Sequence, residues 1–263
     1  MRFKLKLSVN QDNGNALPIN YMYELSSAIY HILSLADDDY ATWLHSNGYQ
    51  DEKKKFKLFT FSRLFIPDFS LDTKNGRLLI NSSSVDWFLA FLPENGTKAF
   101  IKGIFIDQKF TIGDKISKVS FTVSEIDLLP SINDNEKEMD FDTLSPICIS
   151  LKMEDGKVKY LSPLDESFSK GLLQGLLSKY KAYSGKDFPG ETYCDIHLLS
   201  EPKSHLITIK SFTPQETKVK GYSFRFSIRV PFELLTIAYE GGIGEKCSLG
   251  FGMLKVQIVP KWN

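Results

Sequence analysis

The sequence predicts an α+β protein built from two tandem ferredoxin-like domains. Strand-like and helical hydrophobic patterns follow the order β-α-β-β-α-β in each half, which is the order of the ferredoxin-like, or split βαβ, motif. A polar segment, Pro130 to Asp142, separates the halves, and 20 phenylalanines suit sheet packing. A chain of 263 residues accommodates two domains of about 130 residues each. We therefore expect domains at residues 1–132 and 133–263.

The first half begins with a strand over residues 2–9, where apolar and polar residues alternate. Apolar residues at helical spacing predict a helix over 21–35, and a short helix over 38–45 ends at Asn47-Gly48. The other expected elements are a hairpin joining runs 58–66 and 78–81 through Asn75-Gly76, a helix over 85–92, and strands over 100–106 and 118–128.

The second half repeats this order in part. Its first helix is expected over 165–183, because Ser162-Pro163-Leu164-Asp165 places proline and acid near the start. A second helix over 231–239 leads into a glycine-rich segment. The strands are expected over 147–153, 157–160, 192–199, 205–213, 222–230 and 253–259.

Composition narrows the classes of protein. The 32 basic and 32 acidic residues give no net charge, which argues against a protein that coats DNA but allows a local basic face. The three cysteines show no metal-ligand spacing, and their odd number favours a reducing compartment. The start of the chain reads as a strand rather than a signal peptide, and no run has the length of a membrane span. We expect a cytoplasmic protein with no membrane partner and no cofactor.

A glycine-rich loop over residues 241–252 holds five of the 17 glycines. It matches neither the Walker A pattern nor the complete G-x-G-x-x-G pattern, which excludes the two common nucleotide-binding loops. A tight connection between packed elements needs fewer glycines, so we expect the loop to hold an anionic chain such as a phosphate backbone. The residues expected to bind are Gly241, Gly242, Gly244, Lys246, Ser248, Gly250 and Gly252.

The strand before this loop carries two arginines on one face. Phe224, Phe226 and Ile228 form its apolar face, and Arg225 and Arg229 project from the other. Guanidinium groups spaced along a sheet face suit a phosphate chain, although a solvated sheet face explains the same pattern.

Several segments together resemble a known family. The loop Gly241-Gly-Ile-Gly-Glu-Lys-Cys-Ser-Leu-Gly-Phe-Gly resembles the signature loop of the CRISPR repeat-processing endoribonucleases, the CRISPR-associated endoribonuclease six family of the RAMP superfamily. The other matching segments, in the order of the family, are Ala28-Ile-Tyr-His-Ile, Ala41-Thr-Trp-Leu-His, Lys57-Leu-Phe-Thr-Phe-Ser and Thr143-Leu-Ser-Pro-Ile. The resemblance implies RRM- and RAMP-like ferredoxin folds, in agreement with the pattern of elements.

The resemblance also implies an activity and a catalytic set. Members cut CRISPR precursor RNA within its repeats without metal, leaving a 2′,3′-cyclic phosphate and a 5′-hydroxyl. By motif position, Tyr30, His45 and Lys57 take the catalytic roles, with Lys55 as the alternative to Lys57 under a shifted alignment. The residue types suit the chemistry, because histidine exchanges protons near neutral pH and lysine stabilises developing negative charge. Which of Tyr30 and His45 is the acid and which the base stays open.

Other readings of these residues compete. Tyr30 also fits an aromatic at the edge of its helix's apolar stripe, and His45 fits a cation that complements a helix C-terminus. His31 is the neighbouring competitor, whereas His197 and His205 are expected to be structural or on the surface.

The expected partner is CRISPR repeat RNA, together with effector complex subunits or a second copy of the chain. The alternative function is a non-catalytic RAMP-type subunit that binds guide RNA in a ribonucleoprotein complex. A general RNA-binding protein of ferredoxin-like fold is a third reading, and the chain shows no RNP-type run typical of an RRM.

Overall fold

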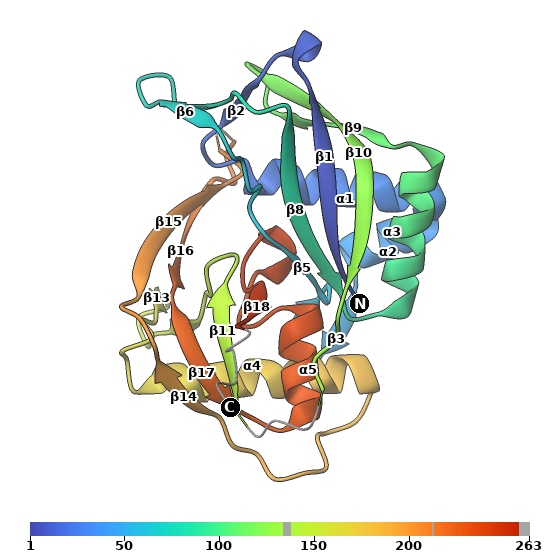
Figure 1. The fold of residues 1–263 in the computed structure, drawn as a ribbon. Coiled ribbons are helices and arrows are strands. Elements are labelled where there is room, and N and C mark those ends of the chain that lie inside the picture. The colour runs from blue at the N-terminus through green and yellow to red at the C-terminus, as the bar shows by residue number, and fades with distance from the viewer. Residues whose placement is uncertain (134–137, 212, 258–263) are drawn as a thin grey trace, which may run out of the picture.

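The first half of the chain forms a five-stranded antiparallel sheet with helices on one face. A computed structural model describes residues 1–133, 138–211 and 213–257. The sheet has the order β5-β8-β1-β10-β9, and α1 and α3 pack together beside it (Figure 1). Its elements are β1 (Arg2–Asn10), α1 (Met22–Ala36), β5 (Phe59–Phe61), β8 (Ser84–Phe91), α3 (Glu94–Ile106), β9 (Lys109–Gly113) and β10 (Lys118–Leu129).

The second half repeats the arrangement with a four-stranded sheet of order β14-β17-β11-β18. Its elements are β11 (Met139–Thr143), α4 (Ser167–Ser184), β14 (Asp195–Leu198), β17 (Arg225–Arg229), α5 (Phe232–Gly241) and β18 (Leu254–Val256). In each half the first strand lies between the third and fourth strands of the motif, and the second strand lies outside the third. This shared order, with all pairs antiparallel, confirms two tandem ferredoxin-like folds.

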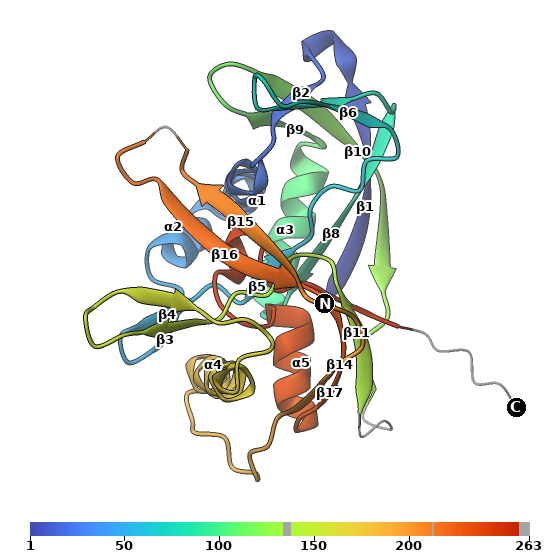
Figure 2. The same ribbon diagram turned by 90° about the vertical axis from the view of Figure 1, so that its left-hand side faces the viewer.

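Each half also contains shorter helices and strands outside its main sheet. In the first half they are η1 (Gln11–Asn13), β2 (Ala16–Pro18), α2 (Asp38–Ser46), β3 (Tyr49–Asp51), β4 (Lys54–Phe56), β6 (Phe69–Asp72) and β7 (Arg77–Ile80). In the second half they are β12 (Ser150–Lys152), β13 (Val158–Tyr160), β15 (Lys203–Ile209), β16 (Thr217–Ser223) and η2 (Cys247–Leu249). The β3–β4 hairpin of the first half packs against α4 of the second, as Figure 2 shows.

Each half has its own hydrophobic core. The first core joins Leu5 and Trp87 of the sheet to Ile29 and Phe100 of α1 and α3. The second joins the strands around Phe141 to α4 and α5. The boundary expected between residues 132 and 133 stays a prediction.

Two expected elements of the first half are wrong. Residues 85–92 were expected to be helical but form β8, in which Val85, Trp87 and Leu89 are buried at period two. The strand expected over 100–106 belongs to helix α3, where Ala99, Phe100 and Gly103 are buried at helical spacing. Packing against α1 outweighs the strand preference of the Phe and Ile residues in this helix.

The hairpin expected at Asn75-Gly76 forms, but with a different partner strand. The strand before the turn is β6 rather than the run 58–66, from which only β5 remains, paired with β8. Gly76 has φ +65°, the left-handed conformation that glycine supplies at low cost. The turn residues therefore predicted the hairpin, whereas the pairing depended on the rest of the sheet.

The polar segment at the junction of the halves also contains a strand. Residues 139–142, expected in a loop, form β11 at the interior of the second sheet. Met139 and Phe141 alternate with Asp140 and Asp142, and the two apolar side chains are buried. Residues 134–137 of this segment, and residues 258 and 259 of the expected last strand, lie outside the described part of the chain.

Candidate functional site

Tyr30 of α1 and His45 of α2 meet through their side chains, and Lys57, the residue after β4, reaches the backbone of His45. The rings of Tyr30 and His45 contact edge to face, with centroids 5.1 Å apart and planes at 84°. The Lys57 Nζ donates a hydrogen bond to the backbone oxygen of His45 at 2.7 Å. The structure thus brings together all three residues that the motifs assign to catalysis.

Local geometry explains how His45 and Lys57 meet across 12 residues. Asp37 caps α2 by accepting a hydrogen bond from the Tyr40 N–H at 2.8 Å, which fixes the start of the helix. After α2 the chain turns at Gly48, whose φ is +63°, and the β3–β4 hairpin returns it to His45. A Cβ at Gly48 would lie 2.5 Å from the Phe56 backbone oxygen, so only glycine permits this close return.

Burial shifts the pKa values of Lys57 and Tyr30, and a nearby charge adds to the shift of Lys57. Partial burial, with the nearby positive charge of Lys55, lowers the pKa of Lys57 to about 8. Burial raises the pKa of the Tyr30 hydroxyl above its ordinary value, and a side-chain hydrogen bond with Ser248 partly opposes this rise. At neutral pH, Tyr30 therefore keeps its proton and Lys57 retains most of its positive charge.

Among the competing residues, Lys55 lies beside the three residues, whereas the other histidines lie outside the group. Lys55 is exposed and donates to the Ser46 backbone oxygen at 3.1 Å, one residue beyond His45. His31 is exposed and lines a shallow pocket with Lys109 and Thr111. The exposed His197 and His205 lie on β14 and β15 of the second half.

The glycine-rich loop is buried between the two halves to an extent that the sequence analysis did not anticipate. A Cβ at Gly242 would lie 2.9 Å from the Thr60 Cβ, and one at Gly244 would lie 2.6 Å from the Cys148 backbone oxygen. At Gly250 and Gly252 a Cβ would overlap Met22 and the backbone oxygen of Ile243, respectively. Close packing is therefore one physical reason for these glycines.

The RNA-binding role expected for the loop stays a prediction. Lys246 is exposed, with φ +56°, and Ser248 is half-buried beside Tyr30. Arg225 and Arg229 are exposed on β17, and the Arg229 guanidinium lies 5.3 Å from the centre of the Tyr193 ring. The neighbouring Ser227 is instead buried and donates to Glu138 at 2.7 Å.

A buried lysine that the sequence analysis missed holds this loop. Lys179 of α4 is only 3% exposed, and its Nζ donates to the backbone oxygens of Gly242 and Gly244 at 2.5 and 2.8 Å. The same Nζ lies 3.2 Å from the Cys247 sulfur. The sequence position of Lys179 could have indicated its burial, because Lys179 continues the apolar stripe of α4 that includes Leu172 and Leu176.

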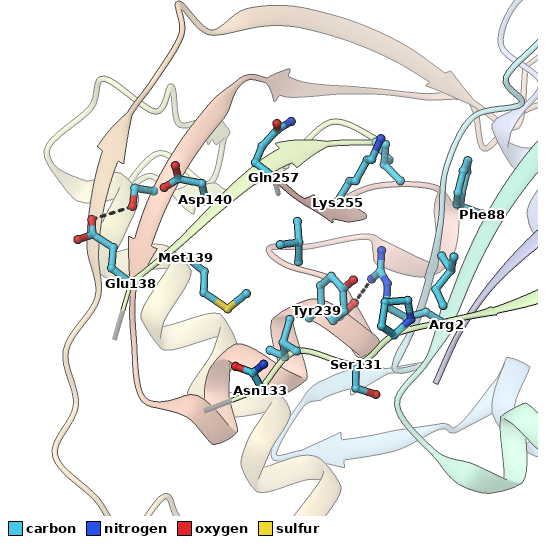
Figure 3. Close-up of a pocket in the computed structure, with 16 residues that line it drawn as sticks. Arg2, Phe88, Ser131, Asn133, Glu138, Met139, Asp140, Tyr239, Lys255 and Gln257 are labelled. Atoms are coloured by element: carbon cyan, nitrogen blue, oxygen red, sulfur yellow. Dashed lines mark hydrogen bonds between the residues drawn. The ribbon is translucent and has the colours of Figure 1, made fainter. Parts of the chain in front are cut away.

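A large cavity lies on another part of the molecule. Its volume is about 860 Å³, and it is lined by β1, β11, α5 and β18 residues that include Arg2, Met139, Tyr239 and Lys255 (Figure 3). Arg2 donates to the backbone oxygens of Tyr239 and Leu254 and lies 3.7 Å from the Tyr239 ring centre. Tyr30, His45 and Lys57 are absent from the described residues that line it, so the cavity and the catalytic set are separate features.

The described residues include neither a metal-binding cluster nor a membrane-crossing helix. Residues 1–133, 138–211 and 213–257 contain no group of three or more His, Cys, Asp or Glu side chains arranged to hold a metal ion. Within those ranges, the helices fall short of the length and apolar character that crossing a bilayer requires.

Comparison with known proteins covers nearly the whole chain. The family pattern "CRISPR-associated protein Cas6, N-terminal" matches residues 16–127, and "CRISPR associated protein Cas6, C-terminal" matches residues 129–256. The chain is 30% identical to "CRISPR-associated endoribonuclease Cas6 1" of Methanocaldococcus jannaschii, over 95% of this chain and 91% of that protein. It is 31% identical to a Cas6 protein of Pyrococcus furiosus named as endoribonuclease-like, over 97% and 98% of the two chains.

A solved structure agrees in fold and in sequence. The structure described as "An RAMP protein binding different RNA substrates" superposes with a TM-score of 0.78 at 28% identity. The superposition covers 98% of this chain and all of the other.

Proposed function

The chain belongs to the Cas6 family of CRISPR-associated proteins, and from this premise we propose that it is an endoribonuclease that cleaves CRISPR precursor RNA within its repeats. The observation that carries the proposal is the convergence of Tyr30, His45 and Lys57 from separate elements. Cleavage proceeds by attack of a ribose 2′-hydroxyl, without metal, and leaves 2′,3′-cyclic phosphate and 5′-hydroxyl ends.

The chemistry needs two proton transfers and stabilisation of negative charge. The 2′-hydroxyl loses a proton as it attacks the phosphorus, and the departing 5′-oxygen gains one. We propose that His45 and Tyr30, whose ring centroids lie 5.1 Å apart, exchange protons with these two oxygens on either side of one phosphate. The Lys57 ammonium, anchored on the His45 carbonyl, supplies positive charge to the phosphorane oxygens.

Substrate binding is proposed to use both halves of the molecule. The exposed Lys246 of the glycine-rich loop, together with Arg225 and Arg229, contacts the RNA backbone, whereas the five glycines of the loop pack against protein. The partner is CRISPR repeat RNA in the cytoplasm, with effector complex subunits and a second copy of the chain as further candidates. A guide-binding RAMP subunit without activity would not require these three side chains to meet, which favours the enzyme.

Cleavage of the cognate repeat RNA in excess EDTA tests the proposal. We expect cleavage to persist, and to stop when the ribose before the scissile phosphate is a 2′-deoxyribose, because the nucleophile is then missing. Tight binding without cleavage would instead support the non-catalytic subunit. Cleavage that EDTA abolishes and Mg²⁺ restores would contradict the metal-free mechanism.

His45→Ala tests the site itself. The single-turnover cleavage rate should fall by at least about tenfold, because general acid–base catalysis contributes at least that much. The Kd for RNA should change little, since His45 acts on the reacting atoms. The matched control is His31→Ala, because His31 is an exposed histidine next to Tyr30 in the sequence. This variant should cleave at the wild-type rate. Wild-type cleavage by His45→Ala would remove His45 from the catalytic set.

A further inference from the structure

One stripe of α1 faces the glycine-rich loop. Met22, Ser26 and Tyr30 are spaced four residues apart, which places them in a row along one side of the helix. The Met22 methyl occupies the space beside Gly250, and the Ser26 hydroxyl donates to the Ser248 backbone oxygen at 2.6 Å. The next residue in the row is Tyr30, one turn further along α1, and its hydroxyl interacts with the side chain of Ser248. Ser248 is thus held at its backbone by Ser26 and lies beside Tyr30.

The opposite side of the loop is fixed from the second half. Lys179 donates to the Gly242 and Gly244 backbone oxygens and contacts the Cys247 sulfur, the residue directly before Ser248. Burying a charged ammonium destabilises a protein unless acceptors bond its hydrogens. The hydrogen bonds from Lys179 therefore hold the loop in this position. The loop is therefore held between α4 on one side and α1 on the other.

From these contacts we propose that Ser248 is a positioning residue, supplied by the second half of the chain, that orients the Tyr30 hydroxyl for catalysis. The proposal rests on the function proposed above. It assigns the Ser248 hydroxyl to Tyr30 rather than to the RNA. Lys179 supports this role by fixing the loop that carries Ser248.

The physical reason lies in how a phenol is oriented. Packing against His45 and Phe59 holds the ring of Tyr30, with the Phe59 centroid at 5.7 Å, but ring contacts leave the direction of the O–H bond free. A hydroxyl partner selects one direction, and a proton is transferred efficiently only when the donor points at its acceptor. Removing the partner should slow the chemical step and leave RNA binding largely intact.

Ser248→Ala provides the test, with the single-turnover cleavage rate, the Kd for repeat RNA and thermal stability measured together. We expect the rate to fall by about threefold to tenfold, the range that loss of one hydrogen bond supplies, with Kd and Tm near wild type. Ser248→Thr, which keeps the hydroxyl, should restore the rate. Ser27→Ala is the matched control, because the exposed Ser27 hydroxyl donates only to the Tyr23 backbone oxygen of its own helix.

A double-mutant cycle separates positioning from direct RNA contact. If Ser248 acts through Tyr30, Ser248→Ala adds no loss in a Tyr30→Phe background, where the phenol is already absent. An equal loss in both backgrounds, or a wild-type rate for Ser248→Ala, would overturn the proposal. A rise in Kd that accounts for the whole rate loss would also overturn it.

Lys179→Met extends the test to the support of the loop. We expect a lower cleavage rate, with that loss reduced in the Tyr30→Phe background, and a lower Tm because two backbone oxygens lose their partner. The outcomes also separate this inference from the proposed function. If His45→Ala abolishes cleavage while Ser248→Ala does not change it, only the inference fails. If wild-type protein does not cleave repeat RNA at all, the proposed function fails.

Discussion

At the scale of single residues, the charge of Lys57 is the feature most sensitive to conditions. Its ammonium is half-buried and faces the positive charge of Lys55, and both effects disfavour the charged form. A lysine with a pKa of about 8 loses its proton as the pH rises through that value. The stabilisation that we propose for Lys57 is therefore expected below about pH 8 and should be lost above it.

Lys57→Arg turns this into a measurable pH dependence. The wild-type single-turnover rate should decline above pH 8, whereas the arginine variant should hold its lower rate into more alkaline solution, because guanidinium stays protonated. Rates are compared from about pH 6 to about pH 10, an interval that includes both the lowered pKa of Lys57 and most of the approach to the ordinary pKa of lysine. If Lys55→Arg removes the alkaline decline and Lys57→Arg does not, the third catalytic position belongs to Lys55.

At the scale of elements, the approach of α3 to α1 depends on one glycine. A Cβ at Gly103 would overlap the backbone oxygen of Ile32, which cannot move without shifting the helix. Gly103 is therefore a contact point between two helices of the first core, and α1 is the helix that carries Tyr30.

Gly103→Ala should lower the free energy of unfolding by about 1–3 kcal/mol, because overpacking outweighs the helix propensity that alanine gains. The matched control is Gly175→Ala, in the middle of α4, where an added Cβ meets no atom within 4 Å. That variant should gain about 0.5–1 kcal/mol, as alanine normally does in a helix. Urea unfolding of both variants measures the difference, and equal effects would reject a tight helix contact.

At the scale of the whole molecule, the two halves are joined by buried polar contacts with the glycine-rich loop. Thr60 of β5 is fully buried, and its hydroxyl donates to the Phe251 backbone oxygen at 2.8 Å. On the side of β1, Arg2 donates to the backbone oxygens of Tyr239 and Leu254, and burial lowers its pKa to about 10. These contacts keep the catalytic elements and the loop in one arrangement.

Thr60→Val should destabilise the protein by about 1–3 kcal/mol, because it leaves a buried carbonyl unpaired with almost no change in shape. The control is Thr111→Val. Thr111 is an exposed strand residue whose hydroxyl pairs with Ser120, so this variant should change the free energy of unfolding by less than about 0.5 kcal/mol. Unfolding in guanidinium chloride gives both values. Equal values for the two variants would show that the Thr60 contact does not stabilise the junction.

Sequence patterns predicted those elements whose signal is local. The alternation of β1, the apolar spacing of α1 and the proline and acid at the start of α4 predicted three elements correctly, because each signal lies in or directly beside its element. The patterns failed at β8 and α3. Both are dense in large apolar residues, and which of these side chains are buried depends on neighbouring elements.

The candidate site also includes residues that the sequence identified and one residue, Lys179, that it did not. Motif resemblance selected Tyr30, His45 and Lys57, although spacing alone did not, and the structure places them in contact. Lys179 was missed because a lysine in a helix is usually solvated, and its burial becomes visible only when the loop that it binds is in place.

The sequence by itself predicted two ferredoxin-like units and located the three residues of the proposed catalytic set and the glycines of the loop. Only the tertiary structure decided what those glycines touch. Gly242 meets Thr60 and Gly250 meets Met22, which lie about 180 and about 230 positions earlier in the chain. Backbone conformation is encoded locally, but close packing between distant segments arises only when both halves have folded against each other, because the atoms that exclude a side chain come from the partner segment.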